Sequence, residues 1–419
     1  MSESKPLATA FDVPLGFSIR AVEETARAVP IVAGPPLPVN LGPLSAFVGT
    51  FVGVGFNTIF RPDSTATPTP MPGPINTTDP PDNILELNLT HETLSFSDNL
   101  GSIPNRGHAN QPDAFLNGVP YVQSINNDAT TGVPGGIHFE PGIWLAVPAT
   151  TNPAEPVTVA RMASIPHGTT IEAQGIALPP IAGKPTIGAV DITPFGGGNP
   201  ANTIRFQNQT VTNKTTRRSP QDLTALNAAG SITQIILDNP NQVLQNQIAN
   251  QTITQTIVIL ISTKPGSPLP RGPLPAGNNP SSPGFGGGTS NMAFLLGQAS
   301  PPAGGGPNTN ANAFQMDAVF WIETVVYNVQ VPPLPAGTPP VVLSPVQTNV
   351  PVVPSFLAAI PFVAGKGFAG GLVKVATTQI QYSQKVVLDF NGLTWPHVSV
   401  ASLVPSEPIP IPSDLLPLT

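Results

Sequence analysis

The chain has 419 residues and includes 55 Pro and 39 Gly, which together make up about 22% of it. Pro at this density interrupts the hydrogen bonds of a helix, so an extensively helical protein is excluded. The absence of Cys excludes a disulfide scaffold and a zinc finger. The 16 basic residues are spread thinly, which argues against nucleic-acid binding. With 40% hydrophobic residues and a net charge of −7, the chain has the composition to fold around a core.

Targeting signals are not visible in the sequence. The first ten residues, MSESKPLATA, lack the basic start and the apolar run of a signal peptide. The longest apolar run, around Ile257–Ile261, is far shorter than the roughly 18 residues of a membrane-spanning helix. We therefore expect a cytoplasmic protein without a membrane span, and the low charge predicts some homo-oligomerisation.

Residues 1–42 have the composition of an extended N-terminal arm. Within them, Ile19–Val29 is the only stretch with helical spacing, and Pro30 would end that helix. The arm is therefore predicted to precede the folded domain, which we expect to begin near residue 43.

From Leu44 onward the sequence is typical of short strands separated by Pro, Gly and Asn. Ile84–Thr90 alternates between leucines and polar residues, and Ile380–Phe390 shows the same period of two. Thr252–Ser262 ends in a continuous apolar run, as in a strand that is covered on both faces. Strands at this spacing without helices between them indicate an all-β barrel or sandwich.

The second half of the chain contains three Pro/Gly-rich stretches, Lys264–Ser290, Ala299–Ala313 and Pro332–Pro354. They bracket two apolar segments, Met292–Leu296 and Phe314–Val331. We predict a barrel formed by residues 43–263 and 372–406, a Pro/Gly-rich insertion with extra short strands at 264–371, and a C-terminal tail at 407–419.

Motifs of common enzyme families are missing from the sequence. It contains no Gly-x-Ser-x-Gly elbow, His-Glu-x-x-His pair, P-loop or dinucleotide fingerprint. Five His residues remain as candidates for chemistry, and His138 lies two residues from Glu140, so both side chains are predicted on one face of a strand. The five are His91, His108, His138, His167 and His397.

One segment resembles the opening strand of the calycin superfamily. Phe47–Phe56, FVGTFVGVGF, carries the Gly spacing that lets a first strand bend tightly as it closes a barrel. Further segments follow in the order of the nitrobindin-like haem-binding barrels of that superfamily. They are Glu92–Phe96, Tyr121–Gln123, His138–Trp144, Ser164–Glu172 and Tyr382–Pro405.

The resemblance implies a calycin-like antiparallel β-barrel that holds haem. His397 falls where the family places its axial ligand, so it is the predicted metal ligand. Aromatic residues would flank the flat cofactor, and the candidates are Trp395, Trp144, Phe56 and Tyr121. Small molecules such as nitric oxide or peroxide would then react at the iron, which makes peroxidase or isomerase chemistry the enzymatic version of this hypothesis.

Two other hypotheses stay open. In the first, the barrel is a cofactor-free enzyme or carrier for an apolar, lipid-like or terpenoid-like substrate. Acid–base chemistry would then come from His138, Glu140, His167, Glu172 and Arg161, because a buried carboxylate beside His can hold a pKa near neutrality. In the second, the chain is a structural protein that self-assembles through residues 1–42.

Overall fold

The computed structural model describes most of the chain from residue 40 onward. The described residues are 40–65, 68–69, 77–108, 110–128, 130–131, 135–151, 154–196, 199–263, 288–291, 312–346, 350–390 and 392–419. The predicted helix Ile19–Val29 and the predicted apolar segment Met292–Leu296 lie outside these residues.

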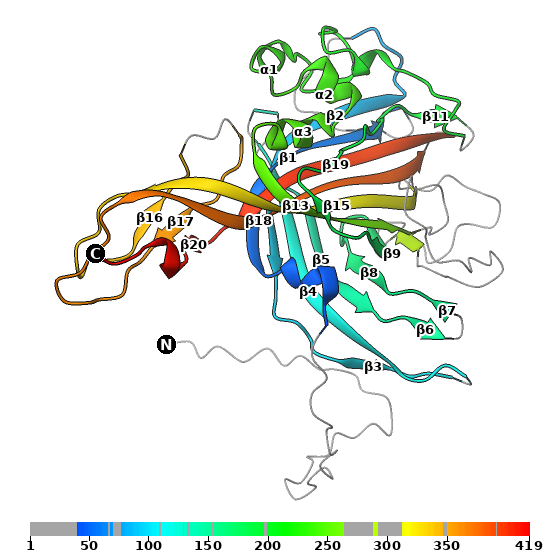
Figure 1. The fold of residues 1–419 in the computed structure, drawn as a ribbon. Coiled ribbons are helices and arrows are strands. Elements are labelled where there is room, and N and C mark those ends of the chain that lie inside the picture. The colour runs from blue at the N-terminus through cyan, green and yellow to red at the C-terminus, as the bar shows by residue number, and fades with distance from the viewer. Residues whose placement is uncertain are drawn as a thin grey trace, which may run out of the picture. The chain divides into compact units, whose positions relative to one another are not determined.

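In the part of the chain that the structure describes, ten antiparallel strands close a β-barrel (Figure 1). Around the barrel they are β13 (Thr252–Ser262), β15 (Asn312–Val331), β18 (Gly371–Phe390), β19 (Leu393–Pro405), β1 (Gly49–Pro62), β2 (Asn83–Phe96), β4 (Ala114–Asn127), β5 (Gly135–Val147), β8 (Thr158–Ser164) and β9 (Thr169–Ala177). The ring closes because β9 pairs with β13, with Ala177 opposite Ile259. The prediction of an all-β antiparallel barrel is confirmed.

Short strands add to the rims and edges of this barrel. They are β3 (Ile103–Asn105), β10 (Ile181–Ala182), β11 (Phe195–Gly196), β12 (Arg218–Ser219) and β14 (Gly288–Asn291), with a separate pair, β6 (Thr150–Thr151) and β7 (Ala154–Glu155). Of these, β12 runs parallel to its neighbour β2.

Close approach of β1 to β19 explains the Gly spacing of the opening strand. A Cβ atom at Gly53 would overlap the carbonyl oxygen of Ser402, and one at Gly55 would overlap that of Val400. Any larger residue would push the two strands apart, so glycine is required here for the barrel to close.

One end of the barrel is filled with hydrophobic side chains. The 3-10 helix η1 (Gly42–Ala46) precedes β1 and contributes the buried Leu44. Phe47 follows, and its ring stacks on Phe96 at 4.7 Å between ring centroids and meets Trp144 edge to face. These side chains belong to a core cluster drawn from strands all around the ring.

A layer of loops and short helices covers the outer face of β1, β2 and β19 (Figure 1). We call it the covering layer, residues 187–196 and 199–251, and it contains η2 (Gln207–Gln209), α1 (Thr224–Ala228), α2 (Gln234–Asp238) and α3 (Gln242–Ile248). Leu85 and Leu87 of β2 point outward into this layer, and Glu86 and Asn88 point inward. Part of the predicted barrel segment 43–263 is therefore a cover rather than barrel wall.

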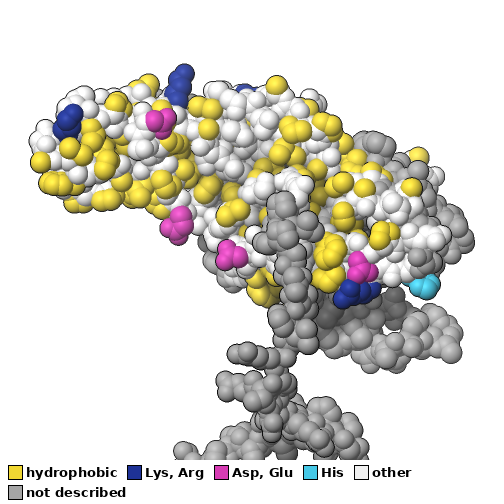
Figure 2. All heavy atoms as spheres, turned by 60° about the horizontal axis from the view of Figure 1, so that its bottom comes forward, with side chains coloured by type: hydrophobic (Ala, Val, Ile, Leu, Met, Phe, Trp, Pro, Cys, Tyr) yellow, Lys and Arg dark blue, Asp and Glu magenta, His cyan; other side chains and the backbone are white. Residues whose placement is uncertain are grey.

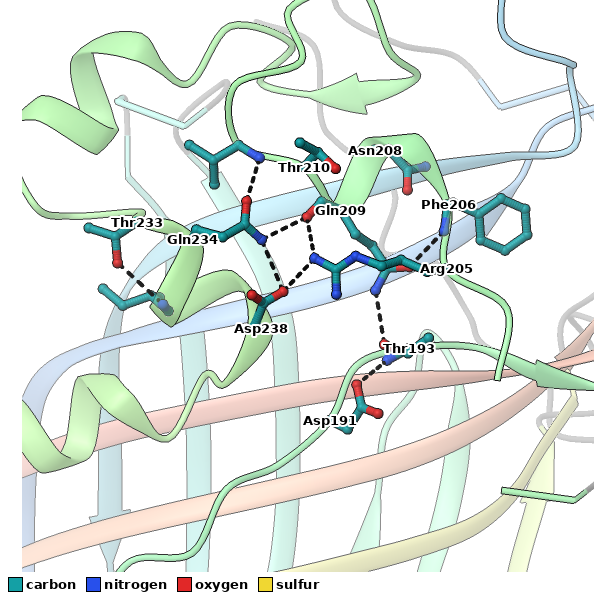
Figure 3. A network of polar contacts seen from close by, with 12 residues as sticks. Asp191, Thr193, Arg205, Phe206, Asn208, Gln209, Thr210, Thr233, Gln234 and Asp238 are labelled. Carbon is teal, nitrogen blue, oxygen red and sulfur yellow. Dashed lines mark hydrogen bonds and ion pairs between the residues drawn. The ribbon is translucent and has the colours of Figure 1, made fainter. Parts of the chain in front are cut away.

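Polar contacts tie the covering layer together (Figure 3). Asp238 in α2 accepts hydrogen bonds from Arg205 at 2.6 Å and from Gln234 at 2.9 Å. The Gln234 side chain in turn accepts from the backbone N–H of Val211 at 2.9 Å. These bonds join the segment around η2 to α2, which matters because each element is too short to be stable alone.

Beyond the barrel, β15 and β18 continue as a long hairpin with Val331 opposite Gly371. This hairpin packs with β16 (Val341–Leu343), β17 (Phe356–Ala358), β20 (Ile409–Pro410) and η3 (Ser413–Leu415) to form a hairpin lobe, residues 328–346, 350–375 and 406–419 (Figure 1). Figure 2 shows hydrophobic side chains gathered over this lobe, at the left of the view, and Phe362 is among the exposed ones.

The lobe changes the predicted domain boundaries. β15 lies within the predicted insertion 264–371, yet it is a full barrel strand that pairs with both β13 and β18. The predicted tail 407–419 is also part of the fold, because β20 pairs with β17. The sequence marked Phe314–Val331 only as an apolar segment of the insertion, because local composition does not reveal the long-range pairing that makes it a barrel strand.

Candidate functional site

Seven buried polar side chains gather on the inward face of the barrel. We call them the interior polar cluster: Glu92, Tyr121, Gln123, Glu140, Arg161, Tyr382 and Gln384. They come from β2, β4, β5, β8 and β18, and hydrogen bonds connect them across the barrel from β2 to β18. Charged groups at such depth are stable only when they are paired.

Glu140 and Arg161 form the ion pair at the centre of this cluster. The guanidinium of Arg161 contacts the Glu140 carboxylate, and it donates to Tyr121 Oη at 2.8 Å and to Gln384 Oε1 at 2.7 Å. Burial alone raises the pKa of Glu140, but the charge of Arg161 and hydrogen bonds from His138 and Tyr121 outweigh it and bring the pKa to about 2. Glu140 is therefore ionised at neutral pH.

Glu92 is a second buried carboxyl group in the same cluster. It accepts hydrogen bonds from Tyr382 Oη at 2.6 Å and from Thr90 Oγ1 at 3.0 Å, with Gln123 at 3.3 Å. Burial outweighs these bonds and raises the pKa of Glu92. Glu92 was not among the residues predicted from the sequence. The available signal was the alternation of β2, which places Glu86, Asn88, Thr90 and Glu92 on one polar face.

His138 extends the cluster along β5. Its Nε2 lies 3.2 Å from Glu140 Oε2, and because an ionised carboxylate only accepts, Nε2 carries the hydrogen. In the neutral ring, Nδ1 is then left as a proton acceptor. His167, in the exposed turn between β8 and β9, meets the His138 ring edge to face at 5.3 Å. Partial burial, followed by the charge of His138, lowers the pKa of His167.

Four of the five predicted acid–base residues therefore come together: His138, Glu140, His167 and Arg161. The fifth, Glu172, does not join them. It lies on the outer face of β9 and is exposed, because its neighbours Ile171 and Ala173 take the inward positions of the alternation. The prediction that all five side chains would converge is therefore wrong.

His397 lies on β19 on the same face as Ser399, whose Oγ accepts from the inward Asn57. Its Nδ1 is 2.9 Å from the backbone oxygen of Thr58, and since a carbonyl only accepts, Nδ1 carries the hydrogen. Among the described residues Nε2 has no hydrogen-bond partner. Burial lowers the pKa of His397 to about 4, more than the bond to Thr58 raises it. The ring is neutral at pH 7.

The aromatic residues predicted to flank a cofactor do not gather around His397. Trp144 and Tyr121 lie within 5.8 Å and 5.6 Å of the Arg161 guanidinium carbon, so their rings enclose that cation. Trp395 stacks on Phe390 with centroids 4.4 Å apart, and Phe56 points outward into the core beneath the covering layer. These four residues therefore belong to two separate hydrophobic clusters.

The remaining two His residues lie on the surface. His91 pairs with Asp128 at 2.9 Å on the outer face of β2, and His108 is exposed in a loop. In the described part of the chain, no group of three or more His, Asp or Glu residues has the arrangement of a metal site. A metal held by His397 would therefore need to bring most of its own ligands, as the porphyrin of haem does.

Comparison of the chain with protein-family models, with curated proteins and with solved structures found no match. The helices in the described ranges are all short, and none could span a bilayer.

Proposed function

We propose that the barrel interior binds a flat hydrophobic ligand of the haem class through Nε2 of His397. The observation that carries this proposal is the state of the imidazole. Its Nδ1–H is fixed on the Thr58 carbonyl and its low pKa keeps it neutral, so Nε2 keeps a lone pair for a ligand. A ring held by a backbone carbonyl through its second nitrogen is the usual geometry of a metal-ligating His.

The residues present fit haem well at the axial ligand, His397. They fit it less well at the aromatic residues that the sequence suggests would flank the porphyrin. The aromatic residues Trp144 and Trp395 are already packed against other side chains. When bound, haem would supply an iron atom with a position for small molecules such as nitric oxide or peroxide. The chain's own contribution would be to hold the axial imidazole neutral and oriented.

Haem titration of the purified protein tests this proposal. We expect haemin to give a Soret band at a ratio of one per chain, and His397→Ala to abolish it. His108→Ala, which removes an exposed His elsewhere, is the matched control and should leave the band unchanged. A protein that takes up no haemin, or equal uptake by both variants, would exclude the proposal.

A second candidate function is cofactor-free acid–base chemistry on an apolar substrate. It is favoured by one observation, the fixed orientation of His138 on the ionised Glu140, which leaves Nδ1 as a base inside the protein. Binding of a fluorescent fatty acid to the wild-type protein would support this candidate. His138→Ala should bind the fatty acid equally well, and it should abolish turnover of the substrate. The two candidates differ in which His they require.

A further inference from the structure

A second buried polar site lies outside the barrel interior, between the barrel wall and α3. Glu323 on β15 is 1% exposed and faces Gln379 on β18. Gln379 Nε2 donates to Glu323 Oε2 at 2.6 Å. The same Gln379 exchanges two hydrogen bonds with Gln251, at 2.9 Å and 2.8 Å. Glu323 therefore lies at one end of a row of buried Gln side chains that are joined by hydrogen bonds.

This chain of amides holds the covering layer against the barrel. Gln247 of α3 donates to Gln379 Oε1 at 3.1 Å and to the carbonyl oxygen of Val352 at 2.8 Å. Gln251 donates to Tyr327 Oη at 3.1 Å. We call Glu323, Gln379, Gln251, Gln247 and Gln381 the outer amide network. A change in the charge of Glu323 would therefore act on the hydrogen bonds that hold α3 against the barrel wall.

Two acceptor atoms of the outer amide network lack a donor. Oε1 of Glu323 and Oε1 of Gln381 are both buried, and neither has a hydrogen-bond partner among the described residues. Gln381 follows Gln379 by two residues on β18, so its side chain lies on the same face and diagonal to Glu323. A buried acceptor without a donor is destabilising, because it has lost its hydrogen bonds to water. Protonation of Glu323 would turn its unpaired oxygen into a donor, and the unpaired oxygen of Gln381 is an acceptor on the same face of the sheet.

In the part of the chain that the structure describes, no cation compensates Glu323. α3, β13 and the segment around Val352 carry no charged side chains, and the titratable group that faces Glu323 is Tyr327. The other charged groups on packed elements are Lys184, which donates to the Ala249 carbonyl, Asp317 further along β15, and Lys385 and the exposed Lys374 and Asp389 on β18. Burial, opposed only by the bond from Gln379, raises the pKa of Glu323 to about 8.

We propose that the folded protein binds one proton at this site, on Oε1 of Glu323, and that the resulting O–H donates to Gln381 Oε1 directly or through one water. The alternative, an ionised carboxylate with a single amide donor, would leave a buried charge without a partner, which is far more costly than protonation. The proton comes from solvent as the carboxylate becomes a carboxylic acid. This site is independent of the ligand proposed for the barrel interior.

The site makes docking of α3 sensitive to pH. A folded-state pKa raised above the ordinary value of 4.5 means that the stabilisation is fully present below pH 4.5 and is lost as pH rises through about 8. Above that pH, a negative charge lies under α3 and weakens the amide contacts. We therefore expect Gln247 and Gln251 to be the first contacts of the covering layer to open in alkaline solution.

Infrared spectroscopy in heavy water tests the proposal directly. We expect the carbonyl stretch of a buried carboxylic acid at pH 7, with the Glu323 part of it lost in Glu323→Gln. This variant should fold, because its amide N–H replaces the acid O–H toward Gln381. Glu92→Gln separates the contribution of the other buried carboxyl group, and Glu407→Gln, on an exposed carboxylate, is the matched control.

Thermal unfolding between pH 6 and pH 9 provides the second readout. The wild-type midpoint should fall across this range, and the Glu323→Gln midpoint should change much less. An infrared spectrum of wild type that equals that of Glu323→Gln would overturn the proposal, since Glu323 would then be an ionised carboxylate bridged by water. If the variant does not fold, disappearance of the wild-type acid band with a midpoint near pH 8 decides the same question.

Discussion

Arg161 and Arg218 are both buried, and each keeps its charge by a different arrangement of acceptors. Arg161 pairs with the carboxylate of Glu140 inside the barrel. Arg218, in the covering layer, instead donates to five backbone carbonyl groups, those of Asn208, Thr210, Asn213, Pro220 and Gln221. The first arrangement depends on one partner, and the second depends on the shape of a guanidinium.

Removal of the charge on Glu140 should destabilise the protein strongly. Glu140→Gln leaves the Arg161 guanidinium buried without its carboxylate, and breaking such a pair costs about 3–5 kcal/mol. Urea unfolding followed by Trp fluorescence measures this loss. Glu172→Gln, on the exposed face of β9, serves as the control and should change stability by no more than about 0.5 kcal/mol. Equal effects of the two variants would contradict the pairing.

Replacement of Arg218 by Lys should also destabilise the protein although the charge is kept. A Lys ammonium has three donors at one point, so it cannot reach all five carbonyl groups, and the loss is about 1–3 kcal/mol. Arg106→Lys, in an exposed pair with Asp113, is the control. Chemical denaturation of both variants measures the difference. An unchanged stability of Arg218→Lys would show that hydrogen bonds to all five carbonyl groups are not required.

At the scale of elements, strand positions followed from alternation and from apolar runs, but the direction of each face did not. Thr252–Ser262 was predicted as a strand and is β13, and Phe314–Val331 lies within β15. In β2, however, the leucines face outward because the covering layer supplies a second hydrophobic core there. A period of two shows that a strand has two unlike faces, and only the packed neighbours decide which face is inside.

Closure of the barrel at β1 and β19 should be sensitive to a single methyl group. Gly53→Ala places a Cβ atom against the Ser402 carbonyl, so the strands must separate, at a cost of about 1–3 kcal/mol or more. Gly135→Ala is a matched control, because Gly135 is also in a strand but has open space around its Cα. Thermal unfolding that ranks the two variants equally would contradict the close approach.

For the whole molecule, the burial of His397 predicts part of the loss of stability at acid pH. Its folded-state pKa of about 4 lies below the ordinary 6.5, so stability is fully present above pH 6.5 and is lost as pH falls through 4. The contribution is at most about 3 kcal/mol. His397→Asn, whose amide can still donate to Thr58, should flatten the profile between pH 6.5 and 4. An unchanged acid limb in a pH series of unfolding midpoints would contradict the buried neutral ring.

Self-assembly through the N-terminal arm stays a prediction, because residues 1–39 lie outside the described residues. Removal of residues 1–39 keeps η1, whose Leu44 fills one end of the barrel, so the barrel should still fold. If the arm drives assembly, size-exclusion chromatography with light scattering should show a smaller oligomer for the truncated chain. Identical masses for both chains would exclude this role.

The sequence by itself determined the composition limits, the all-β class, most strand positions and the need for glycine in β1, because these follow from local backbone preferences and from the period of two. Only the tertiary structure decided that His138, Glu140, His167 and Arg161 meet while Glu172 does not, that Trp395 and Phe56 face another core, and that Glu92 and Glu323 are buried acids. These features depend on strands far apart in the chain, whose pairing no local pattern encodes. Proline does not mark the connections alone, since Pro120, Pro141 and Pro396 lie within barrel strands, and long-range pairing decided that β15, which lies between Pro/Gly-rich stretches of the sequence, became part of the barrel wall.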